Sequence, residues 1–184
     1  GVTDTYTLVL SAPPASNVTL SLNNGTQVTT STGSVVFTSS NWETPVTITV
    51  TAVNDSIAEG AHTGTIAHSS ISSDANFNNL SIASVVANIT DNDTAGFAIG
   101  SISGNTTEAG SGATFTVALS SEPLSNVTIP ISSSNTAEGT LSATGITFTN
   151  LNWSTPQSVS VTGVDDEVDD GDIFSLLQEV VELC

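Results

Sequence analysis

Apolar residues alternate with Thr or Ser along most of this 184-residue chain. The alternation is clearest in six segments of its first half, residues 5–10, 17–22, 35–38, 45–52, 63–68 and 84–90. A period of two is what a strand shows when one of its faces is buried. Thr and Val also favour the pleated backbone, because β-branching restricts χ1. The pattern therefore predicts that these segments are β-strands.

Turn residues separate the predicted strands, as at Pro13–Pro14, Asn23–Gly25 and Ser39–Asn41. Short strands that follow one another at roughly ten-residue intervals are typical of an antiparallel sandwich. We therefore predict an all-β fold of immunoglobulin-like type. The large aromatic residues expected between its sheets are Phe37, Phe148, Trp42 and Trp153. A ligand-stacking role for exposed tryptophans is the less favoured alternative.

The chain contains two copies of one module. Residues 10–22 (LSAPPASNVTLSL) match residues 119–131 (LSSEPLSNVTIPI) at a shift of 109. Residues 35–55 match residues 146–166 at a shift of 111, and both copies carry the motif FTxxNWxTP. Internal matches of this length indicate a duplication. We predict two tandem sandwiches, residues 1–93 and 94–184.

Both repeats are expected to be truncated. The match places Gly1 opposite Gly110, so the first repeat would lack its first strand, the counterpart of residues 94–109. Only thirteen residues follow Gly171, so the second repeat would lack its closing strands. The apolar residues of 173–184 have helical spacing instead. We expect the chain to be part of a longer protein.

Charge adds a functional constraint. The chain has 18 Asp and Glu but no Lys or Arg, and its formal net charge is -18. Nucleic acids and anionic membrane surfaces are bound through Lys and Arg, so neither is expected as a partner. An unpaired buried carboxylate is costly. We therefore expect these carboxylates to face water or a bound cation.

Many of the acids lie near the ends of the repeats. They form four groups: Asp55 with Glu59, Asp91 with Asp93, Glu108, and the run Asp165–Asp172. Loops of a sandwich gather at its two ends, so acids far apart in sequence can converge. Ca²⁺ takes about six to eight oxygen ligands and suits such a set, whereas Mg²⁺ demands a tighter octahedron. Zinc and copper prefer His and Cys, of which the chain has two and one.

The alternative interpretation is that the acids only keep the surface soluble. We favour it for Glu43, Asp74 and Glu122, which lie outside the four groups. Glycoside hydrolysis also uses paired carboxylates, but it needs sugar-stacking aromatic residues, and aromatic residues are only 5% of the chain. His62 and His68 are expected on the surface without a catalytic role. We predict that the chain is not an enzyme.

Residues 37–60, with the motif FTxxNWxTP and a following DxxxEG, and the closing ANITDND of residues 87–93 closely resemble Calx-beta modules. These are calcium-binding sandwiches of sodium–calcium exchangers that also occur in tandem arrays on bacterial surface proteins. The resemblance covers Gly1 to Asp172 and fails over the last dozen residues. It implies that Ca²⁺ binds at the end of each module nearest the next.

The resemblance also implies a set of metal ligands. In the second repeat Glu108 would be the acid of the first strand and Glu138 the acid before a middle strand. The second repeat's remaining candidates, in its acidic loop, are Asp165, Asp166, Asp169, Asp170 and Asp172. In the first repeat the candidates are Asp55, Glu59, Asp91 and Asp93.

Each predicted site departs from the family pattern. The first repeat has Asn54 where the second has Asp165, no acid opposite Glu138 and no first-strand Glu, and the second repeat lacks the terminal acidic triplet. We therefore expect weak affinity at each site.

These features predict a calcium-binding structural or adhesive module pair from a larger extracellular surface protein. Ca²⁺ would rigidify the junctions between neighbouring repeats of the chain, and cell-surface or matrix ligands are further candidate partners. Direct membrane contact by this segment is not expected. The alternatives are a regulatory calcium sensor of a transporter or larger enzyme and, third, a carbohydrate-binding module.

Overall fold

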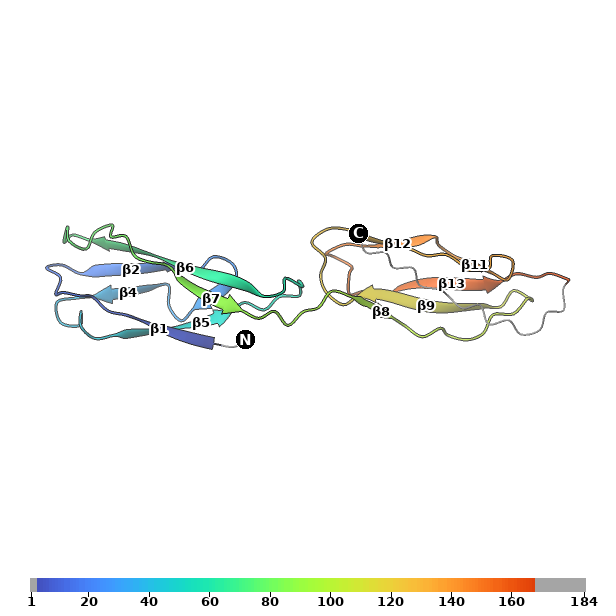
Figure 1. Cartoon of the computed structure of the whole chain (residues 1–184), viewed down its shortest axis with the longest axis horizontal. Helices are drawn as coiled ribbons and strands as arrows, with labels where there is room; N and C mark the ends of the chain where they lie inside the picture. The colour runs from blue at the N-terminus through green and yellow to red at the C-terminus, as the bar shows by residue number, and fades with distance from the viewer. Residues whose placement is uncertain (1–2, 168–184) are drawn as a thin grey trace. The chain divides into compact units, whose positions relative to one another are not determined.

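The structure, a computed structural model, describes residues 3–167 of the chain (Figure 1). This part of the chain contains thirteen β-strands and no helix. The described residues form two compact units: residues 3–55 with Glu59–Asp91 form the first, and Ser56–Ala58 with residues 92–167 form the second. All paired strands are antiparallel. The predicted all-β sandwich class is confirmed.

The first unit has two sheets (Figure 1). One has the order β1-β5-β3 and the other the order β4-β2-β6-β7. Their strands are β1 (Thr3–Leu8), β2 (Val18–Asn23), β3 (Val28–Thr30), β4 (Ser34–Phe37), β5 (Val46–Ala52), β6 (His62–Ser72) and β7 (Val85–Ile89). Each of the six segments predicted from the alternation overlaps a strand, and β3 was not predicted.

The core of the first unit lies between these sheets. Residues of β2 and β4 pack with Ile48 of β5, and Val28 and Val50 pack with residues of β6 and β7. Phe37 is fully buried, as predicted. Trp42 is half-buried and lies outside both core clusters, so the prediction that it fills the space between the sheets is wrong.

Gly64 allows the two sheets of the first unit to approach closely. It is buried on β6, and a Cβ added there would lie 2.5 Å from a methyl carbon of Val28 and 3.3 Å from one of Ile89. Contacts of 2.5 Å are sterically prohibited. Any side chain at this position would therefore force the core residues of β3 and β7 to shift.

The second unit repeats much of this arrangement. Its sheets have the orders β11-β13-β9-β8 and, among residues 3–167, β10-β12. The strands are β8 (Phe97–Ile99), β9 (Gly112–Leu119), β10 (Val127–Pro130), β11 (Gly139–Leu141), β12 (Gly145–Phe148) and β13 (Gln157–Gly163). β8 lies in residues 94–109, where a first strand of the second repeat was predicted.

Phe148 fills the core of the second unit and is fully buried, as predicted. It packs with residues of β9 and β13, and Trp153 lies partly buried against the same cluster. The predicted helical spacing after Gly171, together with the acidic residues Asp169, Asp170 and Asp172, lies outside the described residues.

Candidate functional site

Strand register brings two of the predicted acids of the first unit together. β6 and β7 are antiparallel neighbours, and His62 at the start of β6 lies opposite Ile89 at the end of β7. Glu59 precedes the start of β6, and Asp91 follows the end of β7. The loop before β6 and the segment after β7 therefore meet at one end of the sheet, although 32 positions separate the two residues.

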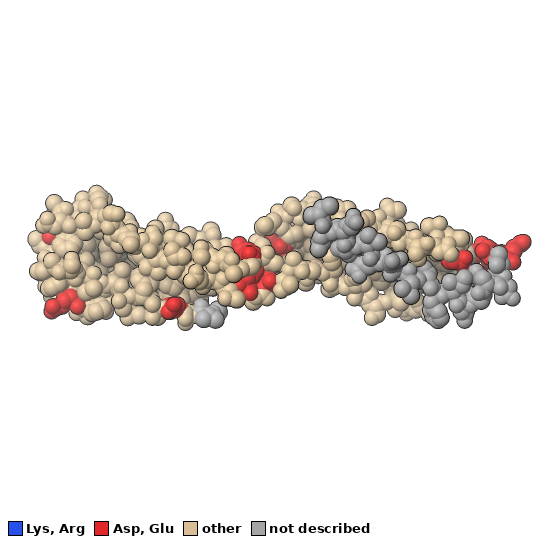
Figure 2. All heavy atoms as spheres, in the orientation of Figure 1, with Lys and Arg blue, Asp and Glu red and all other residues tan. Residues whose placement is uncertain are grey.

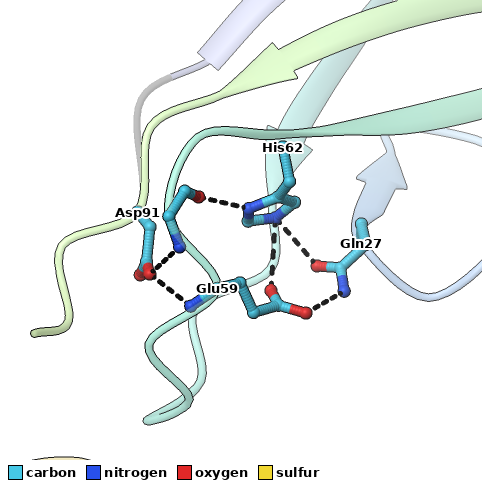
Figure 3. Close-up of polar contacts among 5 residues, drawn as sticks. Gln27, Glu59, His62 and Asp91 are labelled. Atoms are coloured by element: carbon cyan, nitrogen blue, oxygen red, sulfur yellow. Dashed lines mark hydrogen bonds and ion pairs between the residues drawn. The ribbon is translucent and has the colours of Figure 1, made fainter. Parts of the chain in front are cut away.

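The Asp91 carboxylate is bound by the backbone of the loop before β6. Its Oδ2 accepts hydrogen bonds from the backbone N–H groups of Glu59 at 2.7 Å and Gly60 at 2.8 Å (Figure 3). Gly60 has a φ of 69°, a left-handed conformation that glycine adopts without steric cost. Successive N–H groups in such a turn form an anion-binding concavity. Here the chain's own carboxylate occupies it.

The Glu59 carboxylate is held by two side chains. Its Oε1 accepts a hydrogen bond of 3.1 Å from the amide Nε2 of Gln27, and its Oε2 lies 3.3 Å from Nε2 of His62 (Figure 3). The other ring nitrogen of His62 also has a partner, because Nδ1 lies 2.8 Å from the carbonyl oxygen of Gly60. Gln27 precedes β3 in sequence, so the contact joins a third segment to the loop.

The orientation of the Gln27 amide shows which groups donate and which accept hydrogen bonds in this network. The Gln27 amide nitrogen points to Glu59, so its Oε1 points to His62, at 3.2 Å from Nε2. The His62 ring thus faces three oxygen atoms: Gly60 O, Gln27 Oε1 and Glu59 Oε2.

We call the network of Gln27, Glu59, Gly60, His62 and Asp91 the loop clasp. Gln27 has no place in the predicted ligand set, and His62 was expected to be a surface residue. His62 is instead half-buried with defined partners. Of the other first-repeat candidates, Asp55 is exposed in the segment after β5 and Asp93 is half-buried beyond Asp91.

The second unit collects predicted acids from three segments at one end. The carbonyl oxygen of Glu138, just before β11, accepts a hydrogen bond of 3.1 Å from the N–H of Val164, which follows β13. Asp165 and Asp166 come next in the chain. Gly163 lies against the backbone of Thr107, beside Glu108. Glu108, Glu138 and the Asp165–Asp166 pair are therefore brought to the same end of this unit.

These acids do not form a completed metal centre within residues 3–167. In that range no three His, Cys, Asp or Glu side chains are arranged so that they could hold a metal ion. The remaining predicted ligands of the second repeat, Asp169, Asp170 and Asp172, lie outside the described residues. Carboxylate and backbone oxygens are nevertheless the donors that Ca²⁺ prefers.

Asp74 has a structural role that the sequence did not reveal. Its Oδ2 accepts a hydrogen bond of 2.8 Å from the backbone N–H of Ala15, and its Oδ1 accepts one of 3.0 Å from that of Asn76. These backbone donors lower the pKa of Asp74 below its usual value of 3.8. The side chain connects the segment before β2 to the one after β6, so the prediction that it serves only solubility is wrong.

Negative charge is unevenly distributed over the surface. On the face shown in Figure 2, the acidic atoms of the described residues lie in a few separate groups, with uncharged residues between them. Grouped carboxylates repel one another, and no Lys or Arg is present to offset that repulsion.

No helix within residues 3–167 has the length and apolar character of a membrane span. Searches with models of known protein families and against curated protein sequences find no match to this chain.

Proposed function

We propose that this chain is a pair of calcium-binding structural modules from a larger extracellular surface protein. Acidic loops at the ends of its β-sandwich units recruit Ca²⁺, and the bound ion ties together segments that the strands bring close. The function is mechanical and not catalytic. The resemblance of both repeats to Calx-beta modules supports this proposal.

The observation that carries this proposal is that acidic residues from separate segments converge at one end of the second unit. Three separate segments bring Glu108, Glu138 and the Asp165–Asp166 pair to one end, in a chain with no Lys or Arg. An array of carboxylates without basic side chains is unfavourable unless water or a cation compensates it. A hard divalent cation with oxygen ligands is the partner that this chemistry suits best.

The cation would act by stabilising the folded loops. Binding to the folded state alone contributes about 2.7 kcal/mol when free Ca²⁺ is about 100 times the dissociation constant. Extracellular modules work with dissociation constants of roughly 10⁻⁴ to 10⁻³ M, which fits the incomplete ligand sets of these repeats. In a tandem array such stabilisation would stiffen the segments that connect neighbouring repeats and hold an adhesive protein extended.

Calorimetric titration with Ca²⁺ tests the proposal. We expect weak binding that Asp166→Asn reduces by about tenfold or more, because it removes one carboxylate from the proposed site. Glu43→Gln is the matched control: it also removes one negative charge, at an exposed position outside the acidic groups, and we expect it to leave the isotherm unchanged. Equal isotherms for all three proteins would exclude Asp166 as a ligand, and no heat of binding in any of them would refute calcium binding.

A further inference from the structure

The outward face of the sheet β1-β5-β3 carries a regular array of threonines. Every second residue of β1 and β5 faces the core, as Tyr6 and Ile48 do. The residues between them are threonines, and the register places these side by side in three cross-strand pairs: Thr3–Thr51, Thr5–Thr49 and Thr7–Thr47. Thr29 of β3 lies opposite Thr51 and extends one row to a third strand. We call these seven residues the threonine face.

The threonine face has no charged side chain. Asp4 is the one charged residue of β1, β3 and β5, and it points to the opposite side of the sheet because it alternates with Thr3 and Thr5. The threonines of the two edge strands are exposed, and those of the central strand are exposed or half-buried. In a chain with a formal net charge of -18, this face is suited to an uncharged partner.

The hydroxyl groups of this face are available to such a partner. Elsewhere many threonine hydroxyls bind within the chain: that of Thr38 contacts Ser40 and Asn41, and that of Thr149 donates to Asn152. Among the described residues, the threonine face has one internal hydroxyl hydrogen bond, of 3.4 Å from Thr29 Oγ1 to the carbonyl oxygen of Thr51. Each of the other hydroxyls can donate to and accept from an external molecule.

The second unit keeps the same pattern. Its equivalent sheet positions form cross-strand pairs of Thr and Ser, which are Thr114–Ser160, Thr116–Ser158 and Thr140–Thr162. At the shifts of 109 and 111 they align with Thr5–Thr49, Thr7–Thr47 and Thr29–Thr51. Gly112 replaces Thr3, so one position lacks a hydroxyl. Both copies thus present small hydroxyl side chains in register, although their sequences differ elsewhere.

We propose that the threonine face binds ice. Neighbouring strands lie about 4.8 Å apart and alternate residues of a strand about 6.8 Å apart, so the hydroxyls form a two-dimensional lattice. Water oxygens on the prism faces of ice repeat at similar spacings in two perpendicular directions. Hydroxyls can therefore take the place of lattice waters. The methyl groups between them restrict the orientation of adjacent water, which favours an ordered layer.

Other partners fit this face less well. Polysaccharides also present hydroxyl groups, but the threonine face has no aromatic side chain on which a sugar ring could stack. Ice is an uncharged, ordered array of hydrogen-bond donors and acceptors, which corresponds to the neutral, ordered hydroxyls of this sheet. The proposal is independent of calcium binding, so either function can fail without the other.

Partition of the full chain into slowly growing ice tests the proposal, with ice itself as the probe. In Thr5→Lys/Thr114→Lys, a long charged side chain projects from the array of each unit. Thr65→Lys/Thr147→Lys is the matched control, with the same replacements at exposed threonines of β6 and β12 in the other sheet of each unit. Circular dichroism verifies that each variant is folded, and sedimentation velocity measures self-association.

We expect the unaltered chain and the control variant to be enriched in the ice and to slow its recrystallisation. The folded variant Thr5→Lys/Thr114→Lys should remain in the liquid. Thr47→Lys/Ser158→Lys, in the neighbouring row, should do the same and provides a second test. Exclusion of the unaltered chain from ice, or equal capture of all variants, would overturn the proposal. Dimers of the unaltered chain that only the threonine-face variants abolish, without capture in ice, would also overturn it and assign the face to a second copy.

Discussion

The side chains of Tyr6 and His68 join the two sheets of the first unit. Tyr6 lies on β1 and His68 on β6, and the phenolic oxygen lies 2.9 Å from the imidazole Nε2. The rings meet edge to face, with centroids 5.7 Å apart and an interplanar angle of 77°. Nδ1 of His68 lies 3.0 Å from the carbonyl oxygen of Ala83, so the ring also contacts the segment before β7. Contrary to the prediction of a surface position, His68 is half-buried.

Replacing Tyr6 with Phe should lower the free energy of unfolding by about 0.5–1.5 kcal/mol, because it removes one side-chain hydrogen bond and leaves the ring packing in place. Denaturant unfolding monitored by circular dichroism measures the change. Thr5→Val, at the exposed neighbouring position on β1, is the control. An equal loss in both variants would mean that the Tyr6–His68 contact has no specific contribution.

The stability of the chain should decrease at alkaline pH because of Tyr6. Burial raises the pKa of Tyr6 above its usual value of 10.0, so the unfolded chain loses the phenolic proton first. The contribution is complete below that usual value and is lost as pH rises through the higher folded-state pKa. Tyr6 is the only tyrosine of the chain, so tyrosinate absorbance reports it alone. Tyr6→Phe should flatten the alkaline decrease, and an unaltered decrease would assign it to another group.

Gly64→Ala should destabilise the first unit by about 1–3 kcal/mol, the usual cost of overpacking a close-packed core. The new methyl group would meet Val28 and Ile89. Gly33→Ala is the matched control, since a Cβ there has no atom within 4 Å. Thermal unfolding compares them. Adding Val28→Ala to Gly64→Ala should restore part of the loss, whereas identical melting of Gly64→Ala and Gly33→Ala would contradict the packing described here.

Asp74 should contribute to stability at neutral pH and lose this contribution in acid. Its pKa is lowered by the backbone N–H groups of Ala15 and Asn76. The contribution is present above the usual pKa of 3.8 and disappears as pH falls through the lower folded-state value. Asp74→Asn should therefore lower the melting temperature at pH 7 and reduce its acid dependence. Glu43→Gln is the control, and the same pH profile in both variants would contradict this role of the Asp74 carboxylate.

The sequence predicted the strands where alternation runs for several residues, and it failed where the strands are short. β3 has three residues, too few for a period of two to be recognised. Phe37 and Phe148 were assigned correctly to the core because they lie on alternating segments of the two repeats. Trp42 follows its strand, and periodicity gives no information about a side chain beyond the strand's end.

The loop clasp could not be predicted from spacing. Gln27 and Glu59 are 32 residues apart, and the pairing of β3 with β5 places Gln27 beside the loop that follows β5 and carries Glu59. One signal was present in the aligned repeats, since Gln27 aligns with Glu138 at the shift of 111. A glutamine at an acidic position indicates that the two copies differ, but it does not reveal which carboxylate the amide contacts.

The central claim is that the acidic loops bind a divalent cation, and thermal unfolding of the chain in millimolar Ca²⁺ and in EDTA tests it most directly. The account predicts a higher melting temperature in Ca²⁺, with a smaller increase in equal Mg²⁺, because Ca²⁺ binds the folded loops and tolerates their irregular oxygen ligands. Superimposable unfolding curves in Ca²⁺ and EDTA would contradict it.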